Sequence, residues 1–128
     1  MRLMRKAGRA GFATAAVLAL AIPGALIGQI AANAVPSGVS IAYSANAFHG
    51  SVESPSARCE RHRTVSIFKV RPGDDSLVGR DETNRRGRYR VPEQGANGRF
   101  YAKVARKVVG GYNNTVVCQS ARSGTIRV

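Results

Sequence analysis

The chain has 128 residues and a formal net charge of +13, from 20 Lys or Arg and 7 Asp or Glu residues. This length allows one domain of about 100 residues and excludes two. An Arg-rich surface suits bidentate contacts to phosphate or carboxylate groups, and it equally keeps a small protein soluble. The charge alone therefore does not establish an anionic partner.

Residues 1–34 are typical of an export signal peptide. A cationic start precedes an apolar stretch at 12–27, and Ala32 and Ala34 form an Ala-x-Ala cleavage site. We expect cleavage after Ala34 and a secreted or extracytoplasmic protein that begins at Val35. The alternative is an uncleaved signal that anchors the chain in the membrane, since residues 10–34 carry no charge and a helix needs about 20 residues to span a bilayer.

Both cysteines, Cys59 and Cys118, lie after the signal. Thiols of exported proteins meet oxidising conditions, so we expect a disulfide between them. The bond would close a loop of 59 residues, from position 59 to position 118. Closing such a loop stabilises a domain by roughly 4 kcal/mol, which is a large share of a small domain's free energy of unfolding.

The mature chain is expected to contain a linker followed by short strands. Residues 35–46 are uncharged, rich in Ser and Ala, and predict a flexible linker. From residue 47 onward, apolar and polar residues alternate in short runs separated by turn residues. Such runs predict an all-β fold, a small antiparallel β-sandwich over residues 47–128. The seven expected strands cover residues 48–52, 64–68, 77–83, 88–91, 98–105, 115–119 and 125–128.

Several short motifs of this region resemble the prealbumin-like, carboxypeptidase-regulatory-like domain. They are Phe48-x-Gly50-x-Val52, Cys59 leading into Val65 and Ile67, Thr83-Asn84-x-x-Gly87-x-Tyr89, and Gly98-x-x-Tyr101-Ala102. The form with a cysteine before the second strand and another near the end is similar to small exported proteins of actinobacteria. The family usually has Asp at position 84, where Asn makes the same side-chain turn. The resemblance implies a prealbumin-like or immunoglobulin-like sandwich and a non-catalytic accessory or adhesive module.

The strongest candidate for function is the cluster Arg85, Arg86, Arg88 and Arg90. In a strand over residues 86–91, a period of two puts Arg86, Arg88 and Arg90 on one face, with Tyr89 and Val91 toward the core. Their guanidinium groups would follow one another about 7 Å apart, a spacing that suits a polyanion with repeating charge. For an exported protein, such a partner is an anionic cell-wall polymer or a phospholipid surface.

The same arginines can instead keep an outer face soluble and protect it from edge pairing. Similar charges at Arg61, Arg63, Lys69 and Arg71 fit general surface charge as well as the second half of a site. Two hypotheses therefore stay open. In the first, an exported module binds an anionic polymer or lipid through a basic face. In the second, a structural or accessory domain has no ligand and docks on another exported protein through a sheet edge. The first requires the cations to converge on one face.

Other chemistry finds little support in the sequence. A single-strand nucleic-acid binder needs exposed aromatic rings, and only Tyr101 and Tyr112 are expected to be exposed, which argues against nucleic acid. The residues His49 and His62 lack the spacing of a zinc site. A calcium loop is not formed by the acidic residues Asp74, Asp75, Asp81 and Glu82. There is no Gly-x-Ser-x-Gly nucleophile motif. We expect no enzymatic activity, no cofactor and no metal.

Overall fold

The structure is a computed structural model that describes residues 33–128. The expected signal peptide therefore lies outside the described residues, apart from its last two positions. Within the described range the only helix is a short 3₁₀ turn, η2 (Ala57–Cys59). No helix in this range is long and apolar enough to cross a bilayer.

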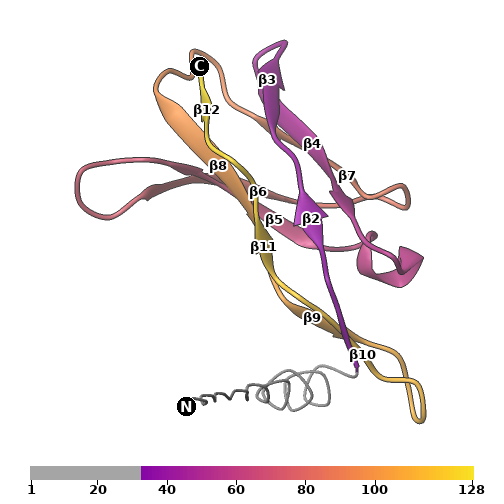
Figure 1. The fold of residues 1–128 in the computed structure, drawn as a ribbon. Helices are drawn as coiled ribbons and strands as arrows, with labels where there is room; N and C mark the ends of the chain where they lie inside the picture. The colour runs from indigo at the N-terminus through magenta and orange to yellow at the C-terminus, as the bar shows by residue number, and fades with distance from the viewer. Residues whose placement is uncertain (1–32) are drawn as a thin grey trace, which may run out of the picture. The chain divides into compact units, whose positions relative to one another are not determined.

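The described chain is an all-β, almost entirely antiparallel sandwich (Figure 1). We call β2 and β3, which both pair with one edge of β4, together with β7 on its other edge, the first sheet. The second sheet has the order β6, β5, β8, with β11 and β12 both on the far edge of β8. The first-sheet strands are β2 (Gly38–Val39), β3 (Ala42–Ser44), β4 (Ala47–Glu53) and β7 (Arg88–Pro92). Those of the second sheet are β5 (Thr64–Lys69), β6 (Ser76–Glu82), β8 (Arg99–Val104), β11 (Ala121–Arg122) and β12 (Ile126–Arg127).

A third, smaller sheet, which we call the extension, projects from the end of the sandwich opposite the C-terminus (Figure 1). It consists of β1 (Ala34–Val35), β10 (Val116–Cys118) and β9 (Lys107–Val109). The β9 and β10 strands form a hairpin, whereas β1 lies parallel to β10. The parallel pair places Ala34 and Val35, the residues on either side of the expected cleavage site, beside Val117 and Cys118 of β10.

The seven expected strands correspond to β4, β5, β6, β7, β8, β10 and β12, so the predicted fold class is confirmed. The expected linker at residues 35–46 is wrong, because this segment forms half of β1 and all of β2 and β3. Its alternating Val39, Ile41 and Tyr43 side chains pack against the core, which offsets the cost of ordering the segment. A two-residue turn at Ala45 and Asn46, with φ of 51° and 57°, joins β3 tightly to β4.

The apolar core lies between the inner faces of the two sheets. The ring of Phe48 from the first sheet packs 4.7 Å, centroid to centroid, from Phe100 of the second and 4.8 Å from Tyr43. Both sheets contribute the remaining buried side chains, which are Val52, Val65, Ile67, Tyr89, Val91, Ala102 and Val104. The alternation of these residues with exposed ones leaves each sheet one polar outer face.

The predicted disulfide between Cys59 and Cys118 is confirmed, and both residues are fully buried. It joins η2 to β10 with a Cα–Cα distance of 5.4 Å. The expectation of surface charge is wrong for Arg63, which is fully buried beside this bridge. Its Nη1 donates to Cys59 O at 2.6 Å, and its Nη2 donates to Ala105 O and Gln119 O at 2.7 and 2.9 Å.

Candidate functional site

The alternation predicted for the arginine cluster is present in β7. Arg88 and Arg90 are exposed, whereas Tyr89 and Val91 retain only 3% and 4% of their exposure. Arg86 is not in the strand, which begins at Arg88, so the expected single row of three is wrong. The strand is shorter because the chain turns just before it.

That turn is built on Asn84, whose side-chain Oδ1 accepts hydrogen bonds from the backbone N–H groups of Arg86 and Arg88 at 2.8 and 3.0 Å. The turn also requires glycine at position 87. Gly87 has a φ of 78°, and a Cβ atom there would lie 2.7 Å from Val52 O. Only glycine fits such a position. The turn therefore places Arg85 and Arg86 outside the sheet, and it fixes Arg88 as the residue where the alternation of β7 begins.

The edge of β7 away from β4 is also fixed. The backbone N–H of Arg90 donates to Asp81 Oδ2 of β6 at 2.8 Å, which ties the first sheet to the second. On the inner face, the hydroxyl of Tyr89 donates to Ser40 O at 2.6 Å. Burial raises the pKa of the Tyr89 hydroxyl, so this group stays a neutral donor. Arg88 and Arg90 thus project from a strand that is held at both edges and, on its inner face, by the hydrogen bond of Tyr89.

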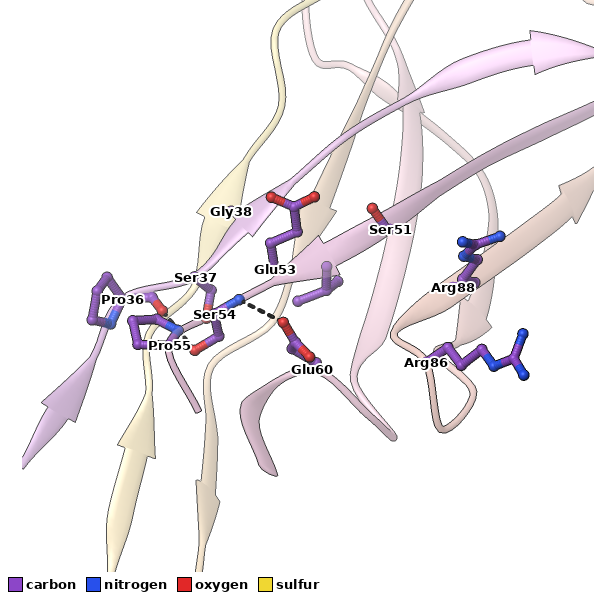
Figure 2. Close-up of a pocket in the computed structure, with 11 residues that line it drawn as sticks. Pro36, Ser37, Gly38, Ser51, Glu53, Ser54, Pro55, Glu60, Arg86 and Arg88 are labelled. Carbon is purple, nitrogen blue, oxygen red and sulfur yellow. Dashed lines mark hydrogen bonds between the residues drawn. The ribbon is translucent and has the colours of Figure 1, made fainter. Parts of the chain in front are cut away.

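Two hollows follow the outer surface along β4 and β7, and together we call them the β7 groove. The larger has a volume of about 730 Å³ and includes Ser51, Glu53, Glu60, Arg86 and Arg88 in its lining. Figure 2 shows Arg86 and Arg88 at one end of it and the two prolines, Pro36 and Pro55, at the other. The smaller hollow shares Ser51 and Arg88 and adds His49 and Arg90. The groove thus runs past three arginines.

The charges of the β7 groove differ between its two ends. Glu53 and Glu60 lie between the arginines and the prolines (Figure 2), and Glu60 Oε2 accepts a hydrogen bond from Ser54 N at 3.1 Å. At the other end, Arg90 lies opposite His49 in the β4–β7 register, and no carboxylate lines that hollow. Within residues 33–128 the sole contact of a basic side chain with a carboxylate inside 4.0 Å joins His62 Nδ1 to Glu82 Oε1 at 3.7 Å. The three groove arginines therefore have no carboxylate within 4.0 Å in this part of the chain.

The second group of expected surface cations does not assemble into a site with the first. Arg61 and Arg71 are exposed, Lys69 is half-buried near the Phe100 ring, and Arg63 is buried. Other cations instead lie on the outer face of the second sheet, which sequence reasoning did not single out. The exposed residues there include Arg80, Arg99, Lys103, Arg122 and Arg127. Positive charge therefore occupies both outer faces rather than one. The convergence on one face that the binding hypothesis requires is not met by the molecule as a whole, and only the β7 groove gathers three arginines locally.

The two tyrosines expected at the surface differ. Tyr112 is 97% exposed at the end of the β9–β10 hairpin, whereas Tyr101 retains only 6% of its exposure. The hydroxyl of Tyr101 donates to Asp75 Oδ2 at 2.7 Å, and Arg122 covers its ring at 3.7 Å. The hydrogen bond from Tyr101 is the main reason that the pKa of Asp75 is lowered, and it also raises the pKa of Tyr101.

The acidic residues considered as calcium ligands have other contacts. Asp75 accepts hydrogen bonds from Tyr101 and from Arg71 N, Asp81 accepts from Arg90 N, and Glu82 pairs with His62 at 3.7 Å. In the described part of the chain, no three His, Cys, Asp or Glu side chains form a group that could hold a metal ion.

Comparisons with known proteins add no relative to this picture. No family model matches the chain, and neither the curated proteins nor the solved structures contain a match to it. The case for function therefore depends on the geometry of the described residues.

Proposed function

We propose that this protein is an exported, non-catalytic module that binds an anionic polymer of the cell envelope through the β7 groove. The observation that carries the proposal is that three arginines line the β7 groove, Arg88 and Arg90 from β7 and Arg86 from the turn before it. None of them has a carboxylate within 4.0 Å among residues 33–128. A guanidinium group without an internal partner is free to make bidentate contacts to phosphate or carboxylate.

The shape of the site supports a polymer over a flat lipid surface. Residues two apart on a strand are about 7 Å apart, which suits successive charges on an extended chain. The mixed-charge end at Glu53 and Glu60 disfavours an anion there, so the contacts centre on Arg88 and Arg90. His49 lies opposite Arg90 and adds a polar ring at the basic end, with its Nε2 atom hydrogen-bonded to Ser44 Oγ at 2.8 Å.

The buried Cys59–Cys118 disulfide supports a location outside the cytoplasm, where thiols are oxidised. Together with the signal-like residues 1–34, it supports a secreted protein cleaved after Ala34. The Asn84 turn and its Gly87 have the geometry that the Thr83-Asn84-x-x-Gly87-x-Tyr89 motif predicts, which supports a prealbumin-like form of the sandwich.

The test is binding of the mature chain to linear polyphosphate, with vesicles of anionic phospholipid in parallel, across a range of salt concentrations. Binding to polyphosphate should weaken as salt rises, because binding releases counterions from the polymer and this release is less favourable at high salt. The groove variant Arg86→Gln, Arg88→Gln, Arg90→Gln should bind more weakly and with a shallower salt dependence. Its fold should be unchanged, since solvated charges contribute little to stability.

The matched control variant is Arg61→Gln, Arg71→Gln, Arg106→Gln, which removes the same charge from three exposed arginines outside the groove. Equal losses in the two variants would contradict a groove site and show that only net charge matters. Stronger binding to vesicles than to polyphosphate would favour a lipid partner. If neither probe binds, the alternative is favoured, an accessory domain that docks on a protein.

A further inference from the structure

The outer face of the second sheet contains a row of cations at one register position. Ser66 of β5 lies opposite Arg80 of β6 on one side and opposite Lys103 of β8 on the other. Lys103 in turn lies opposite Arg122 of β11. Because paired strands are about 4.8 Å apart, Arg80, Lys103 and Arg122 form a row about 14 Å long across four strands. We call these three residues the cross-strand row.

Two members of the row are held in place by neighbouring side chains. Arg80 Nε donates to Ser66 Oγ at 3.3 Å. The guanidinium group of Arg122 lies 3.7 Å from the centre of the Tyr101 ring. That ring is itself fixed, since it stacks on Phe68 at 5.5 Å and its hydroxyl donates to Asp75. Cations ordered before binding lose less entropy when a ligand arrives.

The cations of the row also form no direct salt bridge in the described part of the chain. Within residues 33–128 no carboxylate lies within 4.0 Å of Arg80, Lys103 or Arg122. Asp75, whose pKa is lowered mainly by its hydrogen bond from Tyr101 and in smaller part by the charge of Arg122, already accepts the Tyr101 hydroxyl and a backbone N–H. Two same-face positions further along β8, beyond Tyr101, Arg99 lies opposite Arg127. This face is therefore strongly positive.

We propose that the cross-strand row is a second polyanion site and that one domain bridges two anionic chains. The outer faces of a two-layer sandwich point in opposite directions, and the groove and the row lie on different layers. Chains bound at the two sites are therefore held apart by the full thickness of the sandwich. The second site stands on its own observations, whereas bridging also requires the proposed function of the β7 groove.

Isothermal titration of the mature chain with a short linear polyphosphate separates the two sites. The parent chain should take up two oligomers per domain. The row variant Arg80→Gln, Lys103→Gln, Arg122→Gln and the groove variant should each take up one, and their combination none. With long polyphosphate, the parent should form light-scattering particles that dissolve at excess protein. Both single-site variants should bind without forming such particles.

Substituting Arg122 uncovers Tyr101, so the pair Arg80→Gln, Lys103→Gln is a second row variant that keeps this contact. A row variant that binds two oligomers and forms particles like the parent would overturn the inference. The inference would also be overturned if the parent chain bound only one oligomer and the groove variant bound none. If the groove variant keeps both sites and the row variants lose one, the row is supported and the groove proposal fails. The Arg61, Arg71, Arg106 control variant should keep both sites.

Discussion

The body of the sandwich and the extension are held together by different interactions. In the body, aromatic rings from the two sheets meet at 4.7 Å and apolar side chains fill the space between them. In the extension, the buried connections are the Cys59–Cys118 bridge and the guanidinium group of Arg63. The difference shows that a small chain can order strands beyond its apolar core by using one covalent link and one buried cation.

Arg63 connects segments that are far apart in the sequence. Besides Cys59, Ala105 and Gln119, its guanidinium group donates to Ser37 Oγ at 3.0 Å, so only Nε lacks a partner within the described range. Burial lowers the pKa of Arg63, but an arginine stays charged at neutral pH because its ordinary pKa is so high. Four charge-assisted hydrogen bonds offset much of the cost of removing this charge from water.

The largest expected effect is on the body. Phe48→Ala should lower the free energy of unfolding by about 3 to 5 kcal/mol, because it opens a cavity between the sheets. Denaturant titration measures this, and every probe should report the same transition. If the extension kept its structure while the body melted, the two regions would be independent, contrary to the contacts that Arg63 makes.

The next effect is on the extension. Replacing Cys59 and Cys118 together by Ser should lower the free energy of unfolding by up to about 4 kcal/mol. Strain in the native bridge or residual structure in the unfolded chain would make the decrease smaller. Hydrogen exchange should show that amides of β10 lose protection first, while those of β4 and β8 keep theirs. Uniform loss of protection would show that the bridge stabilises the whole sandwich rather than its end.

Arg63→Met tests the buried cation at similar volume. We expect the free energy of unfolding to fall by about 2 to 3 kcal/mol, because several buried carbonyl oxygens lose their hydrogen-bond donors. Thermal unfolding measures it, with Arg61→Met as the matched control because Arg61 is exposed. Equal stability of the two variants would mean that the apolar replacement packs as well as the hydrogen-bonded guanidinium group.

The smallest effect is expected at a polar contact of the body. Tyr101→Phe removes the hydrogen bond that most lowers the pKa of Asp75, so this pKa should rise toward its ordinary value of 3.8. A carboxylate with a lowered pKa stabilises the fold above its unfolded pKa, and this contribution disappears as pH falls through the folded-state value. The variant should therefore lose less stability on acidification below about pH 4. Carboxyl NMR titration of Asp75 measures the shift, and an unchanged pKa would contradict it.

Local patterns predicted the parts of the fold that depend on neighbouring residues. The alternation of Tyr89 and Val91 with arginines was enough to orient β7, and two cysteines left one possible pairing. Burial of Arg63 was not predictable in this way, because its acceptors come from residues up to 56 positions away. The cross-strand row was missed for the same reason. It depends on the register of four strands, which no single run of sequence contains.

If the leader is cleaved after Ala34, as we propose, the pairing of β1 with β10 sets an order of events for maturation. In the folded domain Ala34 pairs with Val117, and Val35 O accepts a hydrogen bond from Gln119 N at 2.9 Å, directly after the disulfide-bonded Cys118. A peptidase needs the backbone at its cleavage site to be extended and unpaired. The proposed cleavage after Ala34 would therefore have to come before β1 joins the sheet. Under that proposal, export, removal of the leader and closure of the extension would follow one another in time, and a chain that folded before cleavage would keep its leader.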